Sequence, residues 1–362
     1  MNASGPSGRA SGRKLSVAIV GATGAVGEEL LRVMDERRFP VSELLPMASE
    51  RSAGRSVEFG GASHAVRALD VAALQRCDVV FLSAGASLSR TLAPQLLRGK
   101  PRLYDNTSAF RLDPNVPLVV PEVNPQRLTP DHRHAAIANC TAILLVMALA
   151  PIERRFGLER VVVSTYQAVS GAGRRAVTRM IDELRGMLGS DGSGVARAMR
   201  ERGEAPAAGA PHPFAFNCIP SIGELEAGDR GDARSTGEEK KVAAEVRRIL
   251  ERPELPMVAT CVRVPVLRAH SESVLVELRD RSATVASLLD VLRNAPGVEL
   301  RDDLAQGVIP TPREGAGRDG ILVGRVRAAD RPGAFSFFLC GDQLRKGAAL
   351  TAVQLAEMQC CA

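Results

Sequence analysis

The stretch LSVAIVGATGAVG at residues 15–27 decides the fold class of this 362-residue chain. Its first six residues are mostly apolar, which is typical of a buried parallel strand. A glycine-rich turn follows, and apolar side chains then recur at helical spacing to about residue 37. Such a turn lets backbone N–H groups approach a pyrophosphate, whose charge the helix N-terminus favours. The alternative is a tight turn without a ligand. The residues expected to contact a dinucleotide here are Gly21, Thr23, Gly24, Ala25, Val26 and Gly27.

The segment at residues 49–54 bears on the choice of dinucleotide. A domain of this kind usually carries an acidic ribose ligand about 20 residues beyond its glycines. Here the segment reads SERSAG, in which Ser49, Arg51 and Ser52 can hold a 2′-phosphate. We therefore expect NADP rather than NAD, although Glu50 as a ribose ligand would favour NAD.

The rest of the chain is typical of an α/β protein with two domains. Strand and helix signals alternate up to about residue 139, which predicts a Rossmann-like parallel sheet with crossover helices. The second half carries longer β-branched alternations, which predict an antiparallel or mixed sheet. Strands are expected at residues 15–20, 78–83, 118–120, 160–167, 257–266 and 273–279, and helices at residues 177–188, 242–250 and 347–358.

Composition excludes several kinds of partner. Lys and Arg number 47 against 41 Asp and Glu, with both signs interspersed. With 10 Phe, 2 Tyr and no Trp, the chain has few platforms for stacking bases, so no nucleic acid is expected. The longest apolar run, residues 142–152, is about half of the ~20 residues that cross a bilayer, so no membrane is expected. Seven cysteines without paired metal-ligand spacing fit a cytoplasmic protein without a metal site.

Cys140 is the candidate nucleophile. It follows Asn139 and precedes the apolar residues 141–150, which predict a buried helix. A cysteine at a helix N-terminus has its thiolate stabilised by the helix dipole, which lowers the pKa of the thiol below about 8.5. The alternative is a structural cysteine, because free Cys is among the most buried residue types.

Residues 262–271, VRVPVLRAHS, bring a guanidinium and an imidazole close together in sequence. Strand alternation puts Arg263 on the face opposite Val262 and Val264, where its guanidinium suits a planar carboxylate. His270 is expected in the turn after the strand, where it can transfer protons near neutral pH. A surface arginine and a capping histidine are the alternative.

Two further groups are candidates for binding anions. Arg111 ends the polar loop NTSAFR at residues 106–111. Glu238 and Lys241 share a helix face three residues apart, for which a solvated ion pair is the structural alternative.

Together these segments resemble the aspartate-β-semialdehyde dehydrogenase family over nearly the whole chain. The matching stretches are GATGAVG (21–27), SERSAG (49–54), DNTSAFRLD (105–113), VPLVVPEVN (116–124), TYQAVSGAG (165–173), FAFNCIPSIGE (214–224), RVPVLRAHSES (263–273) and DQLRKGAAL (342–350). The resemblance implies NADPH-dependent reductive dephosphorylation of L-aspartyl-4-phosphate. The products are aspartate semialdehyde and phosphate, and the step feeds the synthesis of lysine, threonine and methionine.

The resemblance also implies an architecture and a set of roles. It implies an NADP-binding domain at residues 15–139 and 342–362, and a catalytic and dimerisation domain at residues 140–341. Residues 1–14 are expected to be a disordered tail and residues 190–213 a mobile excursion, and the assembly a homodimer or homotetramer. The implied roles are Cys140 as nucleophile, His270 as acid–base residue, Gln167 as orienting residue, Arg263 as carboxylate ligand, Arg111, Lys241 and Asn139 as phosphate ligands, Glu238 as amine ligand, and Ser170, Gly171 and Gln343 as further cofactor ligands.

Three departures from the family pattern bear on this interpretation. The family usually writes the nucleophile segment as Asn-Pro-Asn-Cys-Ser-Thr, whereas residues 137–142 here read IANCTA. Ala269 replaces a more usual glycine, and Gln343 a more usual asparagine. Two alternatives stay open: a sister reductase acting on N-acetylglutamyl phosphate, and a catalytically degenerate paralogue of the same fold.

Overall fold

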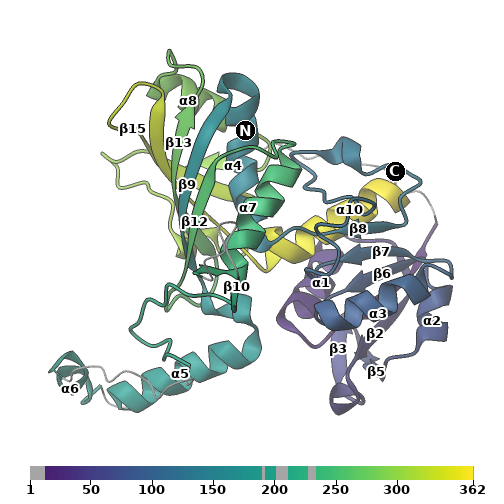
Figure 1. Ribbon diagram of the computed structural model, residues 1–362. Coiled ribbons are helices and arrows are strands. Elements are labelled where there is room, and N and C mark those ends of the chain that lie inside the picture. Colours follow the sequence, from purple (N-terminus) through teal and green to yellow (C-terminus); the bar gives the residue numbers. More distant parts are fainter. Residues whose placement is uncertain (1–12, 190–191, 201–210, 227–233, 362) are drawn as a thin grey trace. The chain divides into compact units, whose positions relative to one another are not determined.

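A computed structural model describes residues 13–189, 192–200, 211–226 and 234–361 of the chain (Figure 1). The chain divides into two compact units, one formed by residues 1–150, 244–254 and 344–362, and the other by residues 151–243 and 255–343. The expected tail at residues 1–14 lies outside the described residues as far as residue 12. Part of the expected excursion at residues 190–213 lies outside them as well.

The first unit contains a parallel six-stranded sheet, as the sequence predicts, in the order β5-β2-β1-β6-β7-β8. Its strands are β1 (Leu15–Val20), β2 (Val41–Ala48), β5 (Arg67–Ala68), β6 (Val79–Leu82), β7 (Arg102–Asp105) and β8 (His134–Ala136). A separate hairpin joins β3 (Ser56–Phe59) to β4 (Ala62–Ala65). The helices of this unit include α1 (Ala25–Glu36), α2 (Val71–Arg76), α3 (Ala86–Leu96) and α10 (Leu350–Cys360).

The strand expected at residues 118–120 is wrong. Leu118 forms only an isolated parallel bridge to Ala136. The side chain of Asn124 makes the hydrogen bonds that a neighbouring strand would make. Its Oδ1 accepts from the N–H of Val120 over 2.8 Å, and its Nδ2 donates to the carbonyl of Leu118 over 3.0 Å. A side-chain amide four residues away has thus replaced a sheet partner.

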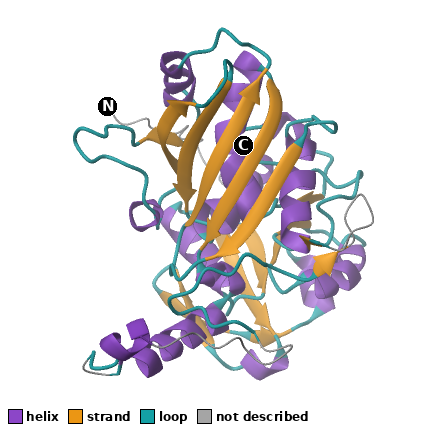
Figure 2. Ribbon diagram, turned by 60° about the vertical axis from the view of Figure 1, so that its left-hand side comes forward, coloured by secondary structure: helices purple, strands orange, loops and turns teal. Residues whose placement is uncertain are grey.

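The second unit contains a mixed six-stranded sheet in the order β12-β9-β13-β16-β15-β14, which confirms the prediction for this half of the chain. Its long strands run side by side in Figure 2. Two of its strand pairs are parallel and three are antiparallel. The strands are β9 (Leu158–Gln167), β12 (Met257–Arg263), β13 (His270–Leu278), β14 (Val298–Leu300), β15 (Ile321–Ala328) and β16 (Ala334–Gly341).

The expected position of His270 in a turn is wrong, because His270 is the first residue of β13. The strand expected at residues 257–266 ends earlier, at Arg263, two residues before Pro265. Proline has no N–H for a sheet ladder, which favours an early end. His270 instead pairs with Gly341 of β16 and so extends β13 toward the N-terminus.

The helices expected in the second half are present. They are α5 (Arg174–Leu188) and α7 (Gly237–Ile249), while α10 is preceded by a π turn at Arg345–Ala349. The other α-helices and strands among the described residues are α4 (Cys140–Phe156), α6 (Val195–Arg200), α8 (Val285–Arg293), α9 (Pro312–Gly315), β10 (Leu225–Glu226) and β11 (Ser235–Thr236). Within the described parts of the chain, every helix is too short or too polar to cross a bilayer.

Candidate functional site

Between β1 and the first residues of α1, the glycines at positions 21, 24 and 27 have no side chain to cover the backbone. Gly21 has φ +95°, and a Cβ there would lie 2.5 Å from the carbonyl oxygen of Ser83. A Cβ on Gly27 would lie 2.3 Å from the oxygen of Gly21. Gly24 caps α1 without a side-chain hydrogen bond. This turn therefore fits a pyrophosphate, because N–H groups at a helix N-terminus bind anions. The predicted Thr23, Ala25 and Val26 lie in the same turn and first helical residues.

The second predicted cofactor segment lies at the same edge of the sheet as the glycine turn. Strands β1 and β2 are parallel neighbours, with Val20 opposite Met47, so both are followed by loops at the carboxyl edge. Ser49 precedes a short 3-10 turn that contains Arg51 and Ser52, and the Arg51 side chain is exposed. An exposed guanidinium at this edge fits the 2′-phosphate that distinguishes NADP from NAD.

Cys140 begins the buried helix α4, as predicted, and is half-buried. Asn139 caps this helix, because its Oδ1 accepts from the N–H of Thr141 over 2.9 Å and from that of Ala142 over 3.3 Å. An asparagine cap of this kind stabilises a helix by about 1 kcal/mol. The thiol therefore lies where the helix dipole favours a thiolate.

Arg111, a predicted phosphate ligand, lies beside the Cys140 segment within the first unit. Its Nε donates to the carbonyl of Ile137 over 2.8 Å, and its Nη1 lies 3.2 Å from Oε1 of Glu245. The other carboxylate oxygen of Glu245 accepts from the backbone N–H of Asn139. One carboxylate thus orients Arg111 and Asn139, two of the three predicted phosphate ligands.

Sequence reasoning missed Glu245. Its signal was available, because Glu245 lies on the same face of α7 as Val242, Val246 and Ile249, all nearly fully buried. A carboxylate on an apolar helix face needs a partner, since a buried charge without one is costly.

In the second unit, the backbone of one residue, Ala168, holds both Arg263 and His270. The N–H of Ala168 donates to Nδ1 of His270 over 3.0 Å, and the carbonyl of Ala168 accepts from Nη1 of Arg263 over 2.6 Å. Because Nδ1 accepts a hydrogen bond, the neutral ring carries its proton on Nε2. Burial and the Arg263 guanidinium hold the pKa of His270 well below its ordinary value of 6.5.

Gly171 lies against both of these side chains. A Cβ on Gly171 would lie 3.0 Å from Cε1 and 3.2 Å from Nε2 of His270, and 3.3 Å from Nη1 of Arg263. The imidazole and the guanidinium therefore face the same backbone segment. Among the described residues, Nε2 of His270 has no hydrogen-bond partner, which leaves its N–H for a ligand.

Gln167 and Glu238 also meet in this unit. Gln167 ends β9 opposite Arg263, is 2% exposed, and donates from Nε2 to Oε1 of Glu238 over 3.3 Å. Lys241 lies one turn further along α7 and is half-buried. The carboxylate of Glu238 and the amide of Gln167 thus meet at the end of β9.

The side chain of Gln343 is hydrogen-bonded both to Ser170 and to Ala269, the residue before His270. Its Nε2 donates to Oγ of Ser170 over 2.7 Å, and its Oε1 accepts from the N–H of Ala269 over 2.9 Å. Ala269 has φ +70°, a conformation that glycine adopts far more readily. Gln343 therefore holds in place the strained residue that precedes His270.

Glu272 is a second residue that sequence reasoning missed. It lies two residues after His270 on the same face of β13, as strand alternation requires. It is 0% exposed, and neither carboxylate oxygen has a hydrogen-bond partner in the described ranges. Burial raises the pKa of Glu272 well above its ordinary value.

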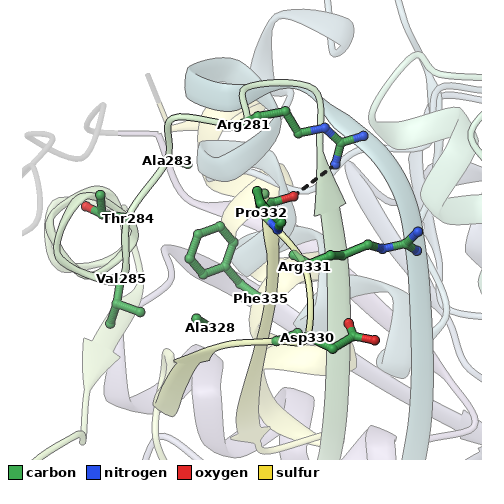
Figure 3. A pocket seen from close by; sticks show the side chains of 12 residues that line it. Arg281, Ala283, Thr284, Val285, Ala328, Asp330, Arg331, Pro332 and Phe335 are labelled. Carbon is green, nitrogen blue, oxygen red and sulfur yellow. Dashed lines mark hydrogen bonds between the residues drawn. The ribbon is translucent and has the colours of Figure 1, made fainter.

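A hollow of about 530 Å³ in the second unit holds none of the predicted site residues (Figure 3). It is lined by the loops around Arg281 and Arg331, next to β15 and β16. Nη1 of Arg281 donates to the carbonyl of Pro332 over 3.4 Å, and Arg331 pairs with Glu277. Both cations at its rim are thus already engaged.

The predicted residues therefore divide between the two units. The first unit contains Gly21, Thr23, Gly24, Ala25, Val26, Gly27, Ser49, Arg51, Ser52, Arg111, Asn139 and Cys140. The second contains Gln167, Ser170, Gly171, Glu238, Lys241, Arg263, His270 and Gln343.

Two family models match the chain. One, described as the NAD binding domain of semialdehyde dehydrogenase, matches residues 16–130. The other, described as the dimerisation domain of semialdehyde dehydrogenase, matches residues 149–346.

Individual proteins similar to the chain carry a consistent name. An aspartate-semialdehyde dehydrogenase from Bacillus subtilis is 40% identical over 347 residues, which cover 96% of this chain and 97% of that protein. One from Aquifex aeolicus is 43% identical over 348 residues, which cover 94% of this chain and 97% of that protein. The crystal structure of aspartate semialdehyde dehydrogenase II from Vibrio cholerae matches with a TM-score of 0.83 at 38% identity. The match covers 96% of this chain and 98% of that structure. The structure of the Vibrio cholerae enzyme complexed with ASA has a TM-score of 0.82.

Proposed function

Because the chain belongs to the aspartate-semialdehyde dehydrogenase family, we propose that it catalyses the reductive dephosphorylation of L-aspartyl-4-phosphate by NADPH. The products are L-aspartate 4-semialdehyde, inorganic phosphate and NADP⁺. This step supplies the synthesis of lysine, threonine and methionine. The observation that carries the proposal is the position of Cys140 at the first residue of α4, capped by Asn139.

Cys140 is the nucleophile in this proposal. Its thiolate attacks the acyl phosphate carbonyl, the C–O bond to phosphate breaks, and a thioester forms as phosphate leaves. Backbone N–H groups at the start of α4 stabilise the oxyanion that develops during attack. A thioester suits the second half of the reaction because it remains an activated carbonyl.

Three residues of the second unit orient the substrate. Arg263 binds the α-carboxylate, because a guanidinium grips a planar carboxylate with two parallel hydrogen bonds. Gln167 orients the acyl group. His270 donates the hydrogen bond of Nε2–H to the carbonyl oxygen. This bond stabilises the negative charge on that oxygen in the tetrahedral adduct formed on reduction, which then collapses to the aldehyde and the Cys140 thiolate.

Phosphate and amine groups have their own ligands. Arg111, Lys241 and Asn139 bind the phosphate, and Glu245 holds Arg111 and the backbone of Asn139 in place. Glu238 pairs with the α-ammonium group. Hydrogen bonds between charged partners are the stronger ones, which favours this charged substrate over a neutral aldehyde.

NADPH supplies the hydride when bound. The turn of the first unit at residues 21–27 binds the pyrophosphate, and Ser49, Arg51 and Ser52 bind the 2′-phosphate. Ser170, Gly171 and Gln343 are proposed to contact the nicotinamide half. These assignments are supported by Gly21, Gly27 and Gly171, which have no side chain at positions where a Cβ would meet neighbouring atoms.

The assembly is proposed to be a homodimer, or a tetramer built from two dimers, formed through the second unit. The support is the exposed face of its sheet, on which Tyr166 is 39% and Val258 51% exposed. A cytoplasmic location is proposed because all seven cysteines, each among the described residues, are free thiols.

The reverse reaction tests the function directly. Purified protein with aspartate semialdehyde, phosphate and NADP⁺ is expected to form NADPH, and Cys140→Ala is expected to abolish this turnover. Cys218→Ala, which removes an exposed thiol, is the matched control and is expected to keep wild-type activity. Turnover only with the N-acetylglutamate semialdehyde analogue would instead identify the sister reductase, and no turnover with either would identify a degenerate paralogue.

A further inference from the structure

A π turn at Arg345–Ala349 precedes α10 in the first unit. The N–H of Ala349 donates to the carbonyl of Leu344 over 3.0 Å, which is the five-residue spacing of a π helix. All five residues of the turn are buried. Single π turns of this kind are rare and recur at functional sites.

Gly347 of this turn lies directly against Cys140. A Cβ on Gly347 would lie 2.7 Å from Cβ of Cys140, closer than such atoms approach in proteins, and 3.1 Å from Cα of Cys140, which is also a tight contact. Gly347 is not among the glycines with positive φ, so its backbone conformation does not itself demand glycine. The contact with Cys140 is what requires glycine at this position.

Lys346, the preceding residue, fixes the turn from inside the unit. It is 0% exposed, and its Nζ donates to Oε2 of Glu122 over 2.6 Å and to Oε1 of Gln354 over 3.0 Å. Nε2 of Gln354 in turn donates to the other oxygen of Glu122 over 3.1 Å. Burial by itself would raise the pKa of Glu122, but the ammonium group and the amide outweigh burial and lower this pKa, which favours the carboxylate.

The backbone of the turn is also held. Oγ1 of Thr351 donates to the carbonyl of Lys346 over 2.7 Å. On the other side, Arg345 lies 2.6 Å from Glu36 and 3.6 Å from Glu29 of α1. The turn is therefore fixed by charged contacts at Arg345 and Lys346, the two residues that precede Gly347.

We propose that this turn positions the nucleophile: the buried cluster of Lys346, Glu122 and Gln354 holds Gly347 against Cys140, which fixes the thiol in the geometry for attack. Gly347 and Lys346 are thus positioning residues. The inference rests on the proposed function in one respect, the role of Cys140 as nucleophile.

Gly347→Ala tests the contact. In an unobstructed helix this change is neutral or stabilising, because alanine restricts the unfolded chain. Here we expect kcat to fall at least tenfold, with KM for NADP⁺ within twofold of wild type. The rate at which iodoacetamide alkylates Cys140, followed by mass spectrometry of its peptide, should also change at least fivefold. Gly186→Ala is the matched control, because Gly186 lies in α5 and a Cβ there meets nothing within 4 Å. It is expected to change neither quantity.

A second pair of variants tests the cluster. Lys346→Met leaves Glu122 buried without its cation and is expected to slow alkylation and lower kcat. Lys346→Met combined with Glu122→Gln removes both charges and is expected to recover a substantial part of both rates. Recovery of thermal stability without recovery of the alkylation rate would mean that the cluster only stabilises the fold.

Wild-type kcat and alkylation rates in Gly347→Ala would overturn the proposal. The alkylation rates need no substrate, so they test the positioning even if the wild type fails to reduce NADP⁺ with aspartate semialdehyde. That failure would contradict the proposed function alone.

Discussion

Ala168 donates its backbone N–H to Nδ1 of His270 over 3.0 Å, and this bond determines which ring nitrogen carries the proton. The ring is then a donor at Nε2 whenever it is neutral. Because burial and Arg263 hold the pKa of His270 well below 6.5, the ring is neutral throughout the physiological range. His270 therefore acts as a neutral hydrogen-bond donor, and not as an imidazolium that titrates near pH 6.5.

The first prediction concerns the pH profile of His270. His270→Ala is expected to lower kcat about 100-fold, the low end of the loss when one hydrogen-bond donor to an oxyanion is removed. His270→Gln keeps an N–H at a similar distance from the backbone and is expected to retain more activity than the alanine variant. The wild-type rate profile should show no inflection near pH 6.5. An inflection there that disappears in His270→Gln would mean that the ring titrates as an ordinary histidine.

Replacing Ala269 by glycine should stabilise the protein. Ala269 holds φ +70°, which costs a residue with a Cβ roughly 1 kcal/mol relative to glycine. Ala269→Gly is therefore expected to raise the free energy of unfolding by about 1 kcal/mol, or Tm by about 2 °C. Ala53→Gly is the control, since Ala53 has φ −61° and glycine there only adds entropy to the unfolded chain. A lower Tm for Ala269→Gly than for wild type would show that the strain is absent.

The buried carboxyl group of Glu272 predicts a pH-dependent stability. Its pKa is raised in the fold, so it stays protonated there while the unfolded chain ionises above its ordinary value of 4.5. A raised folded pKa gives stability that is complete below pH 4.5 and is lost as pH rises, by about 1.4 kcal/mol per pH unit until the folded pKa is reached.

Glu272→Gln removes this loss. The free energy of unfolding of the variant, relative to wild type, is expected to increase from pH 5 to pH 7 in urea titrations. Glu58→Gln, at an exposed position on β3, should show no such trend. A constant difference between Glu272→Gln and wild type across that range would mean that Glu272 ionises normally in the fold.

Cofactor preference should depend on Arg51. Arg51→Ala removes the exposed cation next to the second strand, so KM for NADP⁺ is expected to rise at least tenfold while KM for NAD⁺ changes little. Isothermal titration with each dinucleotide gives an independent measure of the two affinities. An unchanged ratio of NADP⁺ to NAD⁺ efficiency would remove Arg51 from the 2′-phosphate site.

The parts of the fold that sequence predicted best have local signals. The glycines before α1 and the Asn139–Cys140 start of α4 lie next to long apolar patterns, so their helices begin where residue types alone indicate. The position of His270 had no such signal. Its place in β13 depends on pairing with Gly341, which is 71 residues away in sequence.

The side chains that support the candidate site were hardest to predict. Glu245 contacts Arg111 across 134 residues of sequence, and Lys346 contacts Glu122 across 224. A charged residue inside an apolar pattern predicts that a partner exists, because a buried charge needs one. It does not predict which residue the partner is. The bare backbone at Gly347 had no sequence signal, because its cause is the packing of Cys140.

Trapping the acyl-enzyme tests the central claim most directly. Protein incubated with L-aspartyl-4-phosphate without NADPH, quenched in acid and digested, is expected to carry one aspartyl group as a thioester on the Cys140 peptide. Addition of NADPH before the quench should discharge it, and Cys140→Ala should carry none. An aspartyl group on any other side chain, or none in wild-type protein that turns over, would contradict the account.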